Sequence, residues 1–131
     1  MNQSIVAKFG GTSLADAGQF RKVIDIIRSQ PTCQHVVVSA PGKRFSHDEK
    51  VTDLFYSLHK NIINSNTRSL IQKRFEEIVG DLDVDLDICA ELDQIETNIL
   101  QGYSVDYAAS RGEYLSAKIM ARALHLSLIH I

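Results

Sequence analysis

The sequence lacks long apolar runs and any strong excess of one charge. No stretch of its 131 residues approaches the length of a membrane-spanning helix and no signal peptide is visible, so we expect a cytoplasmic protein without a membrane partner. The formal net charge of -2 gives no electrostatic footprint for nucleic acid. Only two cysteines are present, Cys33 and Cys89, and without a partner motif we expect them to be free, mainly buried thiols.

Metal-ligand spacing is also missing. The five histidines are scattered, and the acidic residues between Asp81 and Asp87 alternate with apolar ones without the glycine that a calcium loop needs at its sixth position. We therefore expect no metal site, but a solvated linker followed by a helix from about Val84 to Leu100. With 44% hydrophobic and 23% charged residues, the chain has the composition of one globular domain.

The first forty positions predict a strand, a helix and a second strand. Residues 4–7 are small or apolar and predict a buried, central, parallel strand. Gly10 and Gly11 then allow a sharp turn, and an apolar stripe predicts a helix from about Leu14 to Arg28. Residues 35–39 predict a second buried strand, which completes a right-handed βαβ unit.

The glycine turn is a candidate phosphate site. A turn between a strand and a helix N-terminus gathers unpaired N–H groups, and Lys8 adds a positive charge, while Thr12 or Ser13 is expected to cap the helix. The turn is not a Walker A loop, because the lysine precedes the glycines, and it lacks the third glycine of the dinucleotide fingerprint. On spacing alone, a tight connection with a solvated lysine explains these residues equally well.

A second candidate segment, residues 39–44, leaves the carboxyl end of the second strand. Ligands of open α/β sheets bind at this edge, so we expect the segment to share a crevice with the glycine turn. Small residues followed by two cations suit an anion, although Pro41-Gly42 is also a plain turn signal and each cation is more simply part of a solvated face. Residues 45–49 predict a polar loop, and Thr52 or Asp53 is expected to cap the next helix.

The remainder predicts helices. One helix is expected from about residue 53 to residue 62, with residues 64–66 as the signal that ends it. Another is expected from Thr67 to about Val79, with Gly80 as its stop, and the last spans Val105 to Leu124. Gly112 lies inside the last helix, where glycine costs about 1 kcal/mol relative to alanine. A close approach of backbone or ligand would explain that cost, and a tolerated glycine beside a solvent-facing Glu113 is the alternative.

Two of these motifs resemble the aspartate kinases, within the amino acid kinase superfamily. Lys-Phe-Gly-Gly-Thr-Ser at residues 8–13 is similar to the opening of these enzymes, and Ser-x-Gly-Glu-x-x-Ser at residues 110–116 is similar to a second signature. The resemblance covers residues 4 to about 125. It implies an α/β fold, a three-layer α/β/α sandwich with a mainly parallel sheet that is incomplete on its C-terminal side, with residues 1–125 forming the N-terminal part of the kinase domain.

The resemblance also implies an activity. This is the ATP-dependent phosphorylation of the L-aspartate side-chain carboxylate to 4-phospho-L-aspartate, the first step towards lysine, threonine and methionine. ATP would be the co-substrate, Mg²⁺ would be held through its phosphates, and the parent enzyme would be a homo-oligomer. The residues implied are Lys8 as catalytic cation, Lys8, Gly10, Gly11, Thr12 and Ser13 for the phosphates, and Ser39, Thr52 and Glu113 for the amino acid.

The end of the chain departs from the family. The Gly-Arg-Gly-Gly-Ser-Asp segment and the sensing domains of aspartate kinases are not in these residues, and Leu-Ser-Leu-Ile-His-Ile at 126–131 resembles a translated sequencing adaptor. We therefore expect residues 126–131 to be a non-native tail and the chain alone to be inactive. The alternatives are a non-catalytic fragment and a sister amino acid kinase with another carboxylate substrate, although a sister kinase should lack the signature at 110–116.

Overall fold

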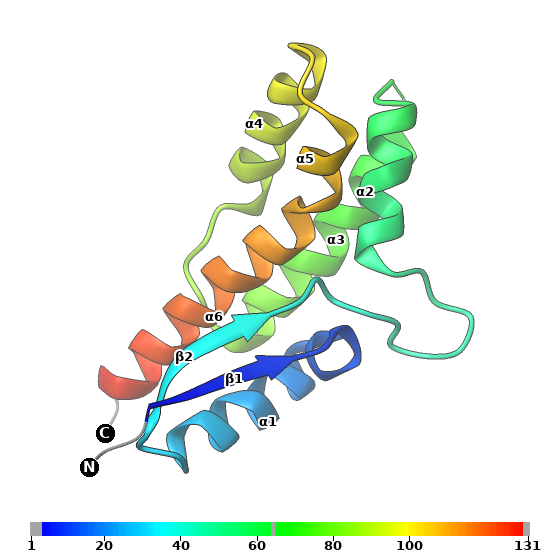
Figure 1. Cartoon of the computed structure of the whole chain (residues 1–131). Helices are drawn as coiled ribbons and strands as arrows, with labels where there is room; N and C mark the ends of the chain where they lie inside the picture. Colours follow the sequence, from blue (N-terminus) through cyan, green and yellow to red (C-terminus); the bar gives the residue numbers. More distant parts are fainter. Residues whose placement is uncertain (1–3, 64, 130–131) are drawn as a thin grey trace.

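The computed structural model describes residues 4–63 and 65–129. A parallel pair of strands lies at one end, with one helix connecting the two strands and the other helices on one side of them (Figure 1). In chain order the elements are β1 (Ile5–Phe9), the 3-10 turn η1 (Gly11–Leu14), α1 (Ala17–Arg28), β2 (Cys33–Val38), α2 (Val51–Lys60), α3 (Ser65–Leu82), α4 (Ile88–Leu100), α5 (Val105–Ala109) and α6 (Arg111–Ile129). The predicted α/β class with a parallel sheet is confirmed.

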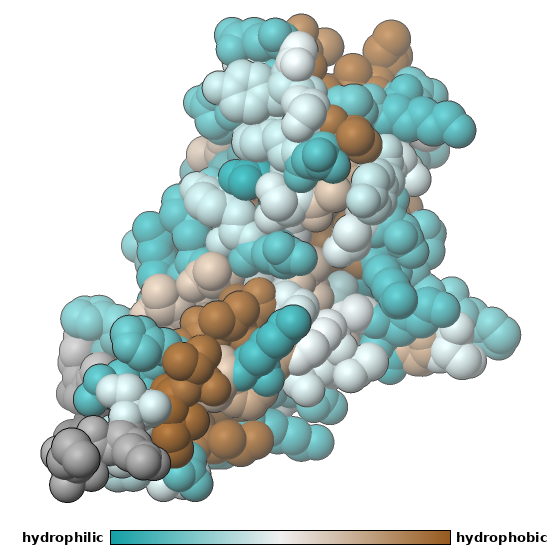
Figure 2. All heavy atoms as spheres, in the orientation of Figure 1, coloured by the Kyte–Doolittle hydropathy of each residue, from teal (hydrophilic) through white to brown (hydrophobic). Residues whose placement is uncertain are grey.

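Only one face of the sheet is covered. Register pairs Lys8 with Val37 and Phe9 with Val38, so that Phe9 and Val38 pack on the core while Lys8 and Val37 lie on the opposite, exposed face. The prediction of two buried strands is therefore wrong, with Val6 64% and Val37 48% exposed. The physical reason is that no helix of the described residues packs on this second face. Its apolar side chains are therefore exposed and form a hydrophobic area on the surface in Figure 2.

The core lies between the helices. The predicted apolar stripes are largely confirmed, because Phe20, Phe55, Phe75, Leu92, Leu115 and Ile119 are fully buried. The helical spacing of Leu70, Ile71, Phe75 and Ile78 predicts one buried stripe on α3, but Leu70 is exposed. Gly80 does not stop α3, which ends at Leu82 before Asp83; the φ of 56° at Asp83 is left-handed, a conformation that aspartate tolerates. The helix predicted from about Val84 begins at Ile88 as α4, because the Asp87 side chain caps it by accepting a hydrogen bond from the Ala90 N–H.

Three other helix starts differ from prediction. Thr12 and Ser13 belong to η1, and α1 is capped by Asp16, whose side chain accepts a hydrogen bond from the Gln19 N–H. Helix α2 begins directly after Lys50 without a side-chain cap, so neither Thr52 nor Asp53 has that role. The predicted 105–124 helix is divided at Ser110 into α5 and α6.

The remaining expectations concern the thiols and the ends of elements. Both cysteines are free, but Cys33 is only partly buried and Cys89 is exposed, so the prediction of mainly buried thiols is wrong. Helix α2 ends at Lys60, and of the predicted 64–66 stop Asn64 lies outside the described residues. Helix α6 continues to Ile129, and positions 130–131 also lie outside the described residues. That residues 126–131 form a non-native tail therefore stays a prediction. None of the helices described here is long and apolar enough to cross a bilayer.

Candidate functional site

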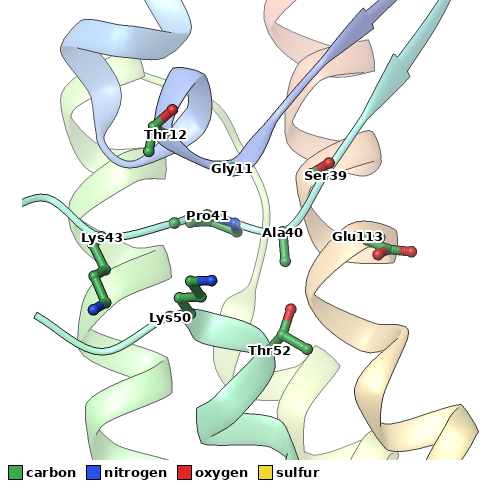
Figure 3. A pocket seen from close by; sticks show the side chains of 10 residues that line it. Gly11, Thr12, Ser39, Ala40, Pro41, Lys43, Lys50, Thr52 and Glu113 are labelled. Atoms are coloured by element: carbon green, nitrogen blue, oxygen red, sulfur yellow. The ribbon is translucent and has the colours of Figure 1, made fainter.

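A pocket of about 390 Å³ opens at the carboxyl ends of β1 and β2, as predicted for the shared crevice. The turn η1, the segment after β2, the start of α2 and the first turn of α6 each contribute part of its wall (Figure 3). The lining residues are Gly11, Thr12, Ser39, Ala40, Pro41, Gly42, Lys43, Lys50, Thr52 and Glu113. Segments as far apart in sequence as Gly11 and Glu113 therefore meet at one site.

Two loops touch at glycines on one side of this pocket. The Gly42 N–H donates a hydrogen bond to the Gly11 carbonyl at 2.8 Å. A Cβ on Gly42 would lie 2.7 Å from the carbonyl carbon of Gly11, and one on Gly11 would lie 3.1 Å from the Ala40 carbonyl oxygen. Such distances are below ordinary van der Waals contact, so the two backbones approach this closely only because both residues lack a side chain.

Helix α6 approaches the same segment from the other side. A Cβ on Gly112 would lie 2.6 Å from the Ala40 Cβ and 3.1 Å from Val51 Cγ1. The close approach given above as a reason for this glycine is thus confirmed. The buried segment of Ala40, Pro41 and Gly42 is fixed further by a hydrogen bond from the Val51 N–H to the Pro41 carbonyl at 3.1 Å. It forms a floor clamped between the glycine turn, α2 and α6.

The polar side chains around this floor have both charges. Lys43 lies at one end of the pocket and Glu113 at the other, and Lys50 and Thr52 point from the start of α2 toward Ala40 (Figure 3). Within the part of the chain that the structure describes, no hydrogen bond or ion pair engages the side chains of the lining residues Thr12, Ser39, Lys43, Lys50, Thr52 and Glu113. These groups are available to a ligand that itself has charges of both signs.

The structure separates the predicted site residues into two sets. Five of them line the pocket together: Gly11, Thr12, Ser39, Thr52 and Glu113. Lys8, Gly10 and Ser13 do not line it, because Lys8 projects from β1 on the uncovered face of the sheet and the Ser13 N–H is bonded to the Gly10 carbonyl at 3.1 Å. Lys43, for which a solvated face was the simpler interpretation and anion binding the alternative, lines the pocket together with Lys50, and both residues are exposed.

Sequence reasoning missed Arg74 altogether. Its side chain, 5% exposed, donates hydrogen bonds to the carbonyls of Ala15 at 3.0 Å, Gly42 at 2.9 Å and Glu49 at 2.9 Å. Burial lowers the pKa of Arg74, and the positive charge of Arg44 lowers it further. A signal was present in the sequence, since Arg74 falls on the apolar stripe of α3 beside Ile71, Phe75 and Ile78.

The loop that joins Lys43 to Lys50 is closed by an ion pair. Arg44 donates three hydrogen bonds to the Asp48 carboxylate: from its backbone N–H at 3.0 Å, from Nε at 2.6 Å and from a terminal guanidinium nitrogen at 3.0 Å. The hydrogen bond from the Arg44 side chain, above all, holds the pKa of the Asp48 carboxyl well below its usual range. Asp48 also lies 3.7 Å from the Arg74 guanidinium and partly balances that buried charge.

Comparisons with known proteins agree with this architecture. The sequence model of the amino acid kinase family matches residues 3–130. Aspartokinase 3 of Bacillus subtilis (strain 168) is 32% identical over 126 residues, which cover 88% of this chain and 28% of that protein. The crystal structure of Clostridium acetobutylicum aspartate kinase is 45% identical with a TM-score of 0.88, and the match covers 94% of this chain and 29% of that one.

A more distant relative shows the same fold. The structure of E. coli aspartokinase III in complex with aspartate and ADP is 24% identical with a TM-score of 0.74, over 94% of this chain and 29% of that one. The chain thus spans less than a third of the length of the relatives it matches. The resemblance inferred from residues 8–13 and 110–116 is confirmed. Because the family match runs through nearly every described residue and the solved relatives share the fold, the chain belongs to the amino acid kinase family.

Proposed function

We propose that this chain supplies the amino-acid-binding side of an aspartate kinase, in which the γ-phosphoryl group of ATP passes to the side-chain carboxylate of L-aspartate. The observation that carries the proposal is the pocket, where a carboxylate, two ammonium groups and three hydroxyls stand without partners in the described structure. This chain is 45% identical to the matching segment of the Clostridium acetobutylicum aspartate kinase, and this identity supports aspartate as the substrate.

Aspartate has one ammonium and two carboxylate groups, and the pocket offers a complement to each. In the proposed complex Glu113 holds the ammonium group, while the Ser39 and Thr52 hydroxyls donate hydrogen bonds to carboxylate oxygens. Lys50 and Lys43 add positive charge near the carboxylates. The substrate carboxylate is already ionised at neutral pH, so the pocket need only orient it and needs no general base.

The phosphate side of the reaction is proposed for the glycine turn. Lys8 contacts the ATP phosphates together with the turn formed by Gly10, Gly11, Thr12 and Ser13. In the described residues no three His, Cys, Asp or Glu side chains lie together in a way that could hold a metal ion. We therefore propose that Mg²⁺ is held through the ATP phosphates and water, and that the protein contributes mainly positive charge.

The complete reaction is proposed for a longer protein of this family and not for these residues alone. The chain spans less than a third of its relatives, so we propose that by itself it binds the substrate weakly and does not turn it over. The biosynthetic role towards lysine, threonine and methionine, the homo-oligomeric state and the cytoplasmic location are proposals of the same kind. A sister kinase acting on another acidic amino acid is the second candidate, because the pocket chemistry alone does not distinguish aspartate from a longer dicarboxylic amino acid.

A chimaera tests the proposal. Residues 4–125 replace the matching segment of the Clostridium acetobutylicum kinase, and the acyl phosphate formed from ATP and aspartate is trapped with hydroxylamine. We expect activity in the chimaera, its loss on Lys8→Ala and a raised KM for aspartate on Glu113→Gln, with no turnover by the isolated chain. A folded chimaera that uses another acidic amino acid in place of aspartate would favour the sister kinase, and turnover by the isolated chain would overturn its proposed inactivity.

A further inference from the structure

We propose that Arg74 is a positioning residue, which sets the shape of the pocket by holding three separate loop peptides through one buried guanidinium group. The proposal deepens the function proposed above, because the effect of Arg74 on substrate binding rests on that function, whereas its effect on the order of the loop at 43–50 does not. None of the pocket-lining residues is on α3, so that Arg74 acts on a ligand only through other groups.

The three carbonyls held by Arg74 adjoin different walls of the pocket, and of the three residues only Gly42 lines it. Ala15 follows the turn η1, Gly42 ends the floor segment, and Glu49 precedes Lys50 at the entrance of α2. A guanidinium group presents five N–H donors in a rigid plane, which lets one side chain satisfy several acceptors at fixed angles. The relative placement of the turn, the floor and the α2 entrance is thus tied to one side chain.

Two of these carbonyls directly precede the pocket lysines. The Gly42 carbonyl belongs to the peptide group that joins Gly42 to Lys43, and the Glu49 carbonyl belongs to the peptide that joins Glu49 to Lys50. By bonding both peptides Arg74 fixes the points from which the two ammonium groups extend into the pocket. The loop between them is closed by Arg44 and Asp48, and Asp48 also lies 3.7 Å from the Arg74 guanidinium.

The chain offers a matched control in Arg68, on the same helix. The Arg68 side chain is 15% exposed and forms ion pairs with Asp93 and Glu96 of α4, away from the pocket. Replacing either arginine by methionine removes a largely buried charge and leaves polar partners unpaired, so both variants lose stability. Only the Arg74 variant should change the loops around the pocket.

The first experiment measures the order of the loop in the 131-residue chain. Trypsin cleaves after Lys43, Arg44 and Lys50 faster as this segment opens locally, and mass spectrometry follows the rate at these sites. For Arg74→Met we expect the rate to rise about tenfold or more relative to the unsubstituted chain, and for Arg68→Met to stay within about twofold, each at the same interval below its own Tm. Arg74→Lys should lie between, because an ammonium group keeps the charge but not the planar set of donors.

These outcomes decide the loop part of the proposal. Equal acceleration in the Arg68→Met and Arg74→Met chains, or no acceleration in the latter, overturns it. If Arg74→Met does not fold, Arg74→Lys takes its place. A rise in cleavage rate at residues 43–50, relative to the unsubstituted chain, that exceeds the rise at other sites supports the proposal, and an equal rise along the chain overturns it.

The second experiment measures the effect on substrate in the chimaera described above. We expect Arg74→Lys to raise the KM for aspartate about tenfold while kcat stays within about twofold, because the pocket loses preorganisation and not a reacting group. Arg68→Lys should change neither constant. A fall in kcat at unchanged KM overturns the positioning role. A chimaera with unaltered Arg74 that is folded but inactive with aspartate counts against the proposed function, and the proteolysis result then still decides the loop part.

Discussion

Substitution of Gly112 by alanine tests whether the contact between α6 and the pocket floor constrains this chain. The new Cβ would lie 2.6 Å from the Ala40 Cβ, whereas carbon atoms in contact are about 3.5–4.0 Å apart. Helix α6 and the Ala40 segment must therefore separate by about 1 Å. Neither atom belongs to a flexible side chain, so the separation has to come from the backbone.

The magnitude follows from two opposing effects. Alanine gains about 1 kcal/mol over glycine in a helix, while overpacking of a close contact costs about 1–3 kcal/mol. Gly80 isolates the second effect, since it lies inside α3 and a Cβ there would meet no atom within 4 Å. Gly112 lies in the first turn of α6 and Gly80 in the last turn of α3, so alanine gains at most about 1 kcal/mol at either position, and we expect Gly112→Ala to be less stable than Gly80→Ala by about 1–3 kcal/mol.

Urea unfolding at 25 °C, followed by circular dichroism, measures this difference from the midpoints and slopes of the two variants. We expect Gly80→Ala to unfold at a higher urea concentration than the unsubstituted chain and Gly112→Ala at a lower one than Gly80→Ala. Equal midpoints would refute the reasoning, because they would mean that α6 moves away from Ala40 at no cost in free energy.

Three further predictions concern the loops and the core. Gly42→Ala, whose Cβ would lie 2.7 Å from a backbone atom of Gly11, should lower the urea midpoint, whereas Gly10→Ala, in open space, should leave it nearly unchanged; similar losses would contradict this. Asp48→Asn should destabilise by about 1–3 kcal/mol at pH 7. The depressed pKa of Asp48 means that this stability is present above pH about 4 and is lost as the pH falls through the folded-state pKa, so the urea midpoints of the two proteins should converge in acid, and a constant difference would count against it. Phe75→Ala, in the fully buried core, should cost about 3–5 kcal/mol in thermal or urea unfolding, and a loss below 1 kcal/mol would show that the site collapses around the missing ring.

Much of the fold was predictable because it depends on local periodicity. The apolar stripes around Phe20 and Phe55 repeat at helical spacing, and the β-branched run at 36–38 favours an extended chain. Helix ends were harder to predict, since they depend on which of several polar residues reaches the first free N–H. Asp16 takes that role for α1 because the preceding residues coil into a 3-10 turn.

Exposure of the strands depended on partners that local sequence does not specify. The continuous apolar run at 36–38 in β2 fits a sheet covered on both faces, but only the face with Val38 contacts helices in the residues described. An apolar strand sequence indicates that both faces can be covered and does not say what covers them.

The pocket was predictable in its location and only in part in its composition. The rule that ligands bind at the carboxyl edge of parallel strands located Ser39 and Thr12 there, and the motif at 110–116 added Glu113. The places of Lys43 and Lys50 were not predictable, because they depend on how the loop between them closes. The carbonyls at the two ends of this loop are bonded by Arg74, whose further bond to Ala15 joins residues 59 positions apart.

This separation has a consequence for the order in which the chain folds. Closing a loop of that length costs conformational entropy, which the bond between Arg74 and Ala15 offsets only after the loop has closed. Each helix turn, in contrast, forms between residues that are neighbours in sequence. During synthesis the glycine turn leaves the ribosome first, and neither its anchor on α3 nor Glu113 on α6 exists yet. The pocket should therefore be among the last parts of the chain to form, and a ligand that binds it can stabilise the finished fold but cannot guide its early steps.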